Sequence, residues 1–369
     1  MWPESSEQQQ PLRTGLTTGT CATACCVAAA HLLLAKHACQ QASVTLPKGR
    51  IVELEIIDLQ CADQFAHAAT IKDAGDDPDV THGAKIWVNL RLLPTAGITF
   101  KAERGVGTVT RAGLALPVGE PAINPVPRQM MHSNLQLVAQ EYGYKGGFEV
   151  SIGIDQGAEL AQKTMNGRLG IVGGLSVLGT SGIVRPFSCS AWIASIHRGM
   201  DVASANGYQH IAASTGNTSE TYVQQRYQMA PIQLIEMGDF AGAVLKYLNA
   251  TPINKLTLCG GFGKLSKLAN GHLDLHSSRS SIDFEQLAQL AQQQGAQTRL
   301  LEDIRQANTS LQALKACQKD GIDLATAVCQ AAYQQAKQRV PARVEIDIIA
   351  VNQQGALLSQ YPPLPEGAA

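Results

Sequence analysis

A threonine- and glycine-rich segment near the start of the 369-residue chain combines groups that bind anions. Glycine allows close backbone approach and threonine supplies a hydroxyl, while the helix predicted to follow would offer unpaired N–H groups at its N-terminus. The sequence therefore predicts a cradle for a carboxylate or phosphate, although Thr18 or Thr20 could serve only as the N-cap of that helix. The residues of this predicted cradle are Arg13, Thr14, Gly15, Thr17, Thr18, Gly19 and Thr20.

A second group of polar residues lies in and before a helix predicted over residues 190–206. His197 and Asp201 are four residues apart, a spacing that lets a carboxylate orient an imidazole for proton transfer. Nearby cations and a hydroxyl point to an anionic ligand; these are Arg185, Ser188 and Arg198. The alternative is a helix surface with ordinary polar pairs, and the pattern leaves both interpretations open.

Two further segments follow predicted strands and place small or hydroxyl-bearing residues where a ligand would be held. Their candidate binding residues are Ser214, Thr215, Gly216, Gly260, Gly261 and Lys264. The first segment also contains Glu220, a second candidate base, but the whole segment could be a capping turn. The second is followed by two lysines early in a predicted helix, where cations oppose the helix dipole unless an anion lies between them.

Several common site motifs are missing from the sequence. There is no Walker A loop and no G-x-G-x-x-G fingerprint. The nine cysteines are odd in number, scattered and without a C-x-x-C pair, which is typical of reduced thiols in a cytoplasm. Cys21, Cys25 and Cys26 open the first predicted helix without a second close pair, so we expect a thiol-lined core and no protein-bound metal.

The chain falls into two regions with different sequence patterns. Residues 42–127 contain short runs with period-two alternation that predict half-buried strands, and residues 20–37 predict a helix buried on most sides. From about residue 146 strands, glycine-rich turns and helices alternate, which predicts β-α-β units with ligands beyond the carboxyl ends of the strands. We therefore expect an α+β domain with a mixed or antiparallel sheet over residues 12–145. An α/β domain with a largely parallel sheet, C-terminal helices and a returning strand should cover residues 146–352, with loose tails over residues 1–11 and 353–369.

Composition excludes several classes of partner. With 29 Lys and Arg against 30 Asp and Glu, the formal net charge of −1 gives no general basic field for nucleic acid. No run reaches the roughly 18 apolar residues that span a bilayer. The start, MWPESSEQ, lacks a basic region leading into an apolar stretch, so we expect no signal peptide. No nucleic-acid or membrane partner is expected.

Longer ordered matches place these segments in a family. Residues 13–22 (RTGLTTGTCA), 182–188 (GIVRPFS), 191–196 (AWIASI) and 214–216 (STG) resemble the motifs of the CbiD family. These are the cobalt-precorrin-5B methyltransferases of the anaerobic cobalamin pathway, and the resemblance spans about residues 12–352. Departures are small: Leu16 replaces an aromatic, Cys25 and Cys26 replace alanines, and Cys189 replaces a common threonine.

The resemblance implies transfer of a methyl group from S-adenosylmethionine to carbon 1 of cobalt-precorrin-5B, giving cobalt-precorrin-6A, in the cytoplasm. The cobalt then belongs to the substrate. A macrocycle fringed with acetates and propionates fits the predicted anion-binding segments. If a proton must leave the substrate, His197 oriented by Asp201 is the first candidate base and Glu220 the second.

Two other function classes remain open on the sequence. A corrinoid-intermediate carrier without catalysis would bind the macrocycle but not S-adenosylmethionine. A small-molecule kinase is disfavoured by the missing Walker A loop. Transient contact with neighbouring pathway enzymes is compatible with the sequence, which leaves open the oligomeric state and which segment binds the methyl donor.

Overall fold

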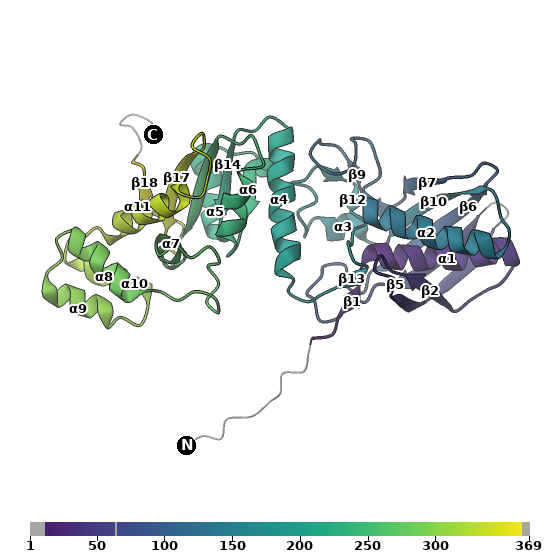
Figure 1. Ribbon diagram of the computed structural model, residues 1–369, viewed down its shortest axis with the longest axis horizontal. Coiled ribbons are helices and arrows are strands. Elements are labelled where there is room, and N and C mark those ends of the chain that lie inside the picture. Colours follow the sequence, from purple (N-terminus) through teal and green to yellow (C-terminus); the bar gives the residue numbers. More distant parts are fainter. Residues whose placement is uncertain (1–11, 63–64, 364–369) are drawn as a thin grey trace, which may run out of the picture. The chain divides into compact units, whose positions relative to one another are not determined.

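The computed structural model describes residues 12–62 and 65–363, which fall into two compact units, unit 1 ending at Ser188 and unit 2 beginning at Cys189 (Figure 1). The division therefore lies between Ser188 and Cys189, not between residues 145 and 146 as the sequence predicts. Strand β10 (Gly147–Ile154) causes the difference, because it pairs with two strands of the first sheet. A strand beside a glycine-rich turn has the same local sequence pattern in either domain. Only the strands with which it pairs show to which domain it belongs.

Unit 1 is built on a five-stranded sheet in the order β4-β5-β6-β10-β7. All neighbours are antiparallel except β10 and β7, which are parallel. This confirms the mixed sheet and the α+β class predicted for the first part of the chain. The remaining elements of unit 1 are β1 (Gly15–Leu16), α1 (Thr18–Ala35), β2 (Gln41–Thr45), β3 (Ile51–Glu55), β4 (Asp58–Cys61), β5 (Ala66–Ile71), β6 (Lys85–Leu93), β7 (Ile98–Ala102), β8 (Gly105–Val106), β9 (Thr108–Val109), α2 (Pro125–Glu141), α3 (Gly157–Ala161), β11 (Ile171–Val172), β12 (Gly174–Leu175) and β13 (Ile183–Val184).

Helix α1 forms the centre of unit 1 and confirms the predicted buried helix. Its small side chains let it pack against β5, β6, β2 and α2 at once (Figure 1). Within the described residues it is the one helix long and apolar enough to cross a membrane, but most of its length is buried inside the protein. The burial is that of a core helix, and it raises the pKa of Cys21 to about 12 and those of Cys25 and Cys26 still further.

Helix α2 is an element that the sequence pattern did not predict. Two prolines in its first turn favour the start of a helix, and one face then buries Met130, Met131 and Leu135. The amide of the buried Asn134 bonds both backbone groups of Thr45, at 2.8 and 2.9 Å. The Asn134 amide thus supplies backbone hydrogen bonds at the edge of β2 that a neighbouring strand would otherwise supply.

Unit 2 is built on a five-stranded sheet in the order β15-β14-β16-β17-β18, in which only β18 is antiparallel. This confirms the largely parallel sheet and the α/β class predicted for the second part. Helices α7 and α11 pack on each other, and α8, α9 and α10 form a cluster beside them (Figure 1). The elements of unit 2 are α4 (Cys189–Ala205), β14 (His210–Ser214), α5 (Asn217–Tyr227), the 3-10 helix η1 (Pro231–Gln233), β15 (Leu234–Glu236), α6 (Ala241–Tyr247), β16 (Lys255–Gly261), α7 (Phe262–Ala269), α8 (Phe284–Gln293), α9 (Thr298–Arg305), α10 (Ser310–Lys319), α11 (Leu324–Lys337), β17 (Glu345–Val351) and β18 (Leu357–Tyr361).

The predicted C-terminal tail is wrong over part of its length. Strand β18 pairs with β17, and the buried Ser359 contacts Thr326 of α11 at 2.7 Å. Prolines and polar residues directly after this short edge strand gave it the composition of a tail. The predicted tail over residues 1–11, and residues 364–369 of the other, lie outside the described residues.

A polar network spans three parallel strands of unit 2. The Nε2 atom of His210 lies 2.8 Å from the hydroxyl of Thr257, and Asp347 accepts from both Thr257 (3.3 Å) and Tyr227 (3.2 Å). Lys255 pairs with the same carboxylate at 3.1 Å. Burial, followed by the charge of Lys255, lowers the pKa of His210 to about 4. His210 is therefore neutral at physiological pH.

This lowered pKa predicts acid sensitivity of unit 2. Since the unfolded chain binds a proton near pH 6.5 and the folded chain near pH 4, the free energy of unfolding should fall as the pH drops between these values. One proton sets a limit of about 1.4 kcal/mol per pH unit, and the partly exposed ring should give less. Denaturant titrations from pH 7 to pH 4 measure the slope, and His210→Gln should flatten it. An equal slope in both proteins would contradict this assignment.

Candidate functional site

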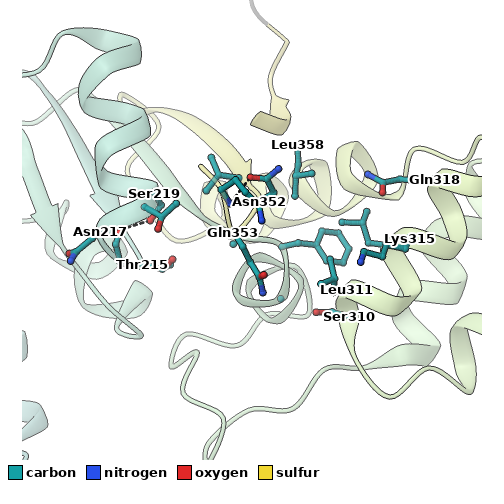
Figure 2. A pocket seen from close by; sticks show the side chains of 18 residues that line it. Thr215, Asn217, Ser219, Ser310, Leu311, Lys315, Gln318, Asn352, Gln353 and Leu358 are labelled. Carbon is teal, nitrogen blue, oxygen red and sulfur yellow. Dashed lines mark hydrogen bonds between the residues drawn. The ribbon is translucent and has the colours of Figure 1, made fainter. Parts of the chain in front are cut away.

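A pocket of about 570 Å3 lies in unit 2, where β14, β16 and β17 end (Figure 2). Pockets of this size hold small molecules, and the carboxyl ends of parallel strands are where open α/β sheets bind them. The lining residues come from the segments after these three strands and from α10 and β18: Thr215, Gly216, Asn217, Thr218, Ser219, Gly261, Phe262, Gly263, Ser310, Leu311, Leu314, Lys315, Gln318, Val351, Asn352, Gln353, Gln354 and Leu358. Of the predicted binding residues, Thr215, Gly216 and Gly261 are brought together here.

The strand order explains why a pocket forms at this place. The chain leaves β14 through α5 and returns to one side of it as β15, then crosses through α6 to the other side as β16. The connections from β14 and β16 therefore diverge, and the space between them stays open at the sheet edge. The segments beginning at Thr215 and Gly261 border this space.

Gly216 and Gly261 have no structural need to be glycine. A Cβ atom added to either would meet no atom within 4 Å, and neither residue has a φ in the left-handed region, since both are extended. At Gly260, by contrast, an added Cβ would lie 2.8 Å from the side chain of Thr215, so that glycine is required for packing. Glycines with free space at the Cβ position in the wall of a pocket allow a ligand to approach the backbone closely.

The electrostatics of the pocket favour a negatively charged group. Helices α5 and α7 begin there with Gly216 and Gly261 as N-caps, and neither helix has a side-chain cap for its first N–H groups. Lys315 supplies a cation, and none of the lining residues is acidic (Figure 2). Helix N-termini and a lysine together stabilise a carboxylate or phosphate.

The sequence pattern missed the lining residues from α10 and from the segment after β17. Asn352 is the last residue of the predicted α/β domain, and Gln353 and Gln354 fell in the predicted tail, although all three follow the last parallel strand directly. The rule that placed Thr215 and Gly261 at this edge would also have placed them. Lys315 had no comparable signal, because it lies within an ordinary amphipathic helix.

The threonine- and glycine-rich segment of unit 1 uses its polar groups internally. The Thr17 hydroxyl caps α1 by accepting from the Thr20 N–H at 3.3 Å, and the Thr20 hydroxyl donates to the Gly182 carbonyl at 2.7 Å. The Arg13 guanidinium pairs with Asp73. These contacts support a structural role, and the N-cap is Thr17 rather than Thr18 or Thr20.

The rest of this segment is packed as closely. Thr14 bridges to Gly75, and Thr18 is buried in the first turn of α1. A Cβ added to Gly19 would lie 2.9 Å from the ring of Pro127. The open cradle expected from the sequence is therefore a joint between parts of unit 1.

An acidic loop over residues 73–79 organises this joint, although no sequence pattern indicated it. Besides pairing with Arg13, Asp73 accepts from the Leu16 N–H through its carbonyl at 2.8 Å. Asp77 accepts from the backbone N–H of Phe187 at 2.9 Å. One loop thus holds both the segment before α1 and the segment that contains Arg185.

His197 and Asp201 meet through a third residue that the sequence did not indicate. The Asp201 carboxylate accepts from the Tyr247 hydroxyl at 2.9 and 3.0 Å, and the Tyr247 ring stacks on the His197 ring with centroids 3.9 Å apart. No hydrogen bond joins His197 to Asp201 in the described chain, so Asp201 orients the tyrosine and the tyrosine supports the imidazole. Neither residue lines the pocket.

The other predicted residues are dispersed. Lys264 pairs with Asp239, so the anion expected beside the helix lysines is a side chain of the protein itself. Burial lowers the pKa of Arg198, whose Nε donates to the Ala194 carbonyl at 3.2 Å. Ser214 is buried at the end of β14, and its hydroxyl has no partner within the described residues.

Three further predicted residues lie at element ends. Glu220 is in the first turn of α5, one residue after Ser219 of the pocket wall. Ser188 is the last residue of unit 1, and Arg185 is exposed directly after β13. Within the described residues, no group of three or more His, Cys, Asp or Glu side chains is placed to hold a metal ion.

Comparisons with known proteins agree on one family. Residues 5–186 match the family model described as CbiD, and residues 274–362 match that described as CbiD, C-terminal domain. Relatives named cobalt-precorrin-5B C(1)-methyltransferase include those of Marinomonas sp. (strain MWYL1), 55% identical over 98% of this chain and 97% of its own length, and of Hahella chejuensis, 56% identical over 98% and 99%. That of Burkholderia thailandensis is 58% identical over 97% and 99%.

A solved structure also matches. The crystal structure of the cobalamin biosynthesis protein cbiD from Archaeoglobus fulgidus is 30% identical, covering 70% of this chain and 80% of that one, with a TM-score of 0.39. The two family models together with relatives above 50% identity over nearly their full length settle the assignment. The chain belongs to the CbiD family.

Proposed function

We propose that the chain transfers a methyl group from S-adenosylmethionine to carbon 1 of cobalt-precorrin-5B, giving cobalt-precorrin-6A in anaerobic cobalamin biosynthesis. The observation that carries this proposal is the identity of 55–58% to relatives named for this activity, over nearly the whole of both chains. Macrocycle methylation in the cytoplasm is consistent with nine cysteines that are all free.

The pocket of unit 2 is the proposed site for the methyl donor. Its volume of about 570 Å3 suits a nucleoside-sized molecule, and Gly216 and Gly261 leave the backbone open to it. The uncapped N-termini of α5 and α7, with Lys315, suit the carboxylate of the donor's amino-acid part. Apolar side chains such as Leu314 and Phe262 offer a surface on which the adenine ring of the donor can pack. The residues present therefore fit the donor.

The chemistry expected of the chain is alignment. When bound, S-adenosylmethionine supplies an electrophilic methyl carbon on a sulfonium sulfur. Displacement at that carbon needs no protein nucleophile, so holding the reactants in line and excluding water should account for most of the rate enhancement. The buried thiols of α1, with their raised pKa values, have no part in such a reaction.

Donor binding separates this function from that of a non-catalytic corrinoid carrier. Calorimetric titration of the full chain with S-adenosylhomocysteine should show saturable binding. A carrier would bind the macrocycle and show no heat with S-adenosylhomocysteine or S-adenosylmethionine. That result would favour the carrier and remove the enzyme proposal.

His197 is the proposed residue for accepting a proton, with Glu220 as the second candidate. We expect His197→Ala to lower turnover about tenfold or more, because a positioned base contributes at least that much. The fold should persist, since the ring lies on a half-exposed face of α4. Tyr247→Phe is the matched control: it keeps the stacked ring, loses the hydroxyl bond to Asp201 and should affect turnover less. Unchanged turnover in His197→Ala would remove the residue from the reaction.

A further inference from the structure

Phe187 combines two features that the fold does not explain. Its side chain is 68% exposed, and its φ of 54° lies in the left-handed region that disfavours residues with a side chain. The other non-glycine residues with positive φ in the described chain are polar and occupy helix-cap positions: Lys36, Gln156 and Gln228. An exposed aromatic in this conformation loses stability without gaining burial, and such strain is kept where a function requires it.

The surrounding residues hold the Phe187 backbone in place. Its N–H donates to the half-buried Asp77 at 2.9 Å, and β13, three residues earlier, pairs with β1. The conformation is therefore fixed from within unit 1, while the ring remains in solvent. An exposed aromatic ring on a backbone held in place is suited to stacking on a flat conjugated ligand.

Arg185 adds the charge that such a ligand would need. It lies two residues before Phe187, is exposed, and has no ion-pair partner in the part of the chain that the structure describes. A guanidinium pairs with a carboxylate through two parallel hydrogen bonds. An aromatic ring alone offers a carboxylate no such partner.

We propose that Phe187 and Arg185 form a substrate contact of unit 1. The ring stacks on the face of the conjugated macrocycle, and the guanidinium pairs with one of its peripheral carboxylates. This inference rests on the proposed function and adds a residue that recognises the ring system itself. Contact with the macrocycle explains why a phenylalanine occupies a position with a strained φ, where glycine would fold more easily.

The test compares Phe187→Gly, Phe187→Ala and Phe187→Tyr in the full chain. Anoxic titration with cobalt-precorrin-5B, followed by its visible absorption, should give a Kd raised about tenfold in the glycine and alanine variants, since stacking of a ring on an aromatic side chain contributes on this scale. The tyrosine variant should bind like the parent. The glycine variant should melt a few degrees above the alanine variant, because only glycine relieves the positive φ.

Two controls make the result specific. Gln228→Gly and Gln228→Ala repeat the comparison at another left-handed position, and should differ in melting temperature without changing the macrocycle Kd. S-adenosylhomocysteine binding should be the same in all variants. An unchanged macrocycle Kd in Phe187→Gly and Phe187→Ala would overturn the inference. If the parent protein binds the macrocycle but transfers no methyl group, the proposed function fails while weakened binding in these variants still supports the contact.

Discussion

Replacing both open glycines of the unit 2 pocket by leucine should abolish most donor binding without unfolding the protein. A leucine at Gly216 or Gly261 meets no protein atom at its Cβ and needs no strained φ. Its branches would occupy the pocket at the carboxyl ends of β14 and β16. Crowding of this kind costs about 1 to 3 kcal/mol per site, so the double variant should weaken S-adenosylhomocysteine binding about a hundredfold or more.

A matched control is available in unit 1. Gly167 is exposed, has no atom within 4 Å of an added Cβ and lacks a positive φ, but lies outside the pocket. Gly167→Leu should therefore leave donor binding unchanged, and its melting temperature gives the cost of the substitution itself. Donor affinity equal to the parent in Gly216→Leu with Gly261→Leu would show that the donor binds elsewhere.

Gly15→Ala should unfold or strongly destabilise unit 1, because the segment before α1 is a packed joint and not an open cradle. An added Cβ would lie 2.0 Å from the Ala74 backbone, which cannot move without breaking the contacts of Arg13 and Leu16 with Asp73. We expect a loss above about 3 kcal/mol, or a melting temperature lower by about 10 °C. Differential scanning calorimetry measures this.

The alternative role of this segment predicts the opposite pattern. If Gly15 served to admit a ligand, Gly15→Ala would keep the parent melting temperature and lose affinity for the substrate or the donor. Gly167→Ala is the control for an unstrained, exposed glycine and should change the melting temperature little. An unaltered melting temperature in Gly15→Ala would contradict the structural role.

Local patterns predicted the elements whose signal lies within the element. The helix predicted over residues 190–206 is α4 (Cys189–Ala205), and the alternation of strands and helices predicted the parallel sheet of unit 2. The position of β10 could not be predicted in this way, because its assignment depends on partners far away in the sequence. Strand β18 was hidden by the composition of a tail.

In the candidate site, too, local signals were predictable and contacts with distant residues were not. Thr215, Gly216 and Gly261 were predictable, since they lie at or directly after the carboxyl ends of strands that end at one edge of a sheet. The role of the segment around Thr17 was not, because hydroxyls and glycines suit a ligand cradle and a packed helix start equally well. Only the contacts with Gly182 and Asp73 decide between them. Tyr247 between His197 and Asp201 likewise comes from another helix.

The most direct test of the proposed function is the mass of the macrocycle after anoxic incubation of the full chain with S-adenosylmethionine and cobalt-precorrin-5B. We predict a product heavier by one methyl group and an equal amount of S-adenosylhomocysteine. The Gly216→Leu and Gly261→Leu double variant should form much less of both at a donor concentration that just saturates the parent. An unchanged macrocycle mass, with both ligands shown to be bound, would contradict the assignment of this chain as a methyltransferase.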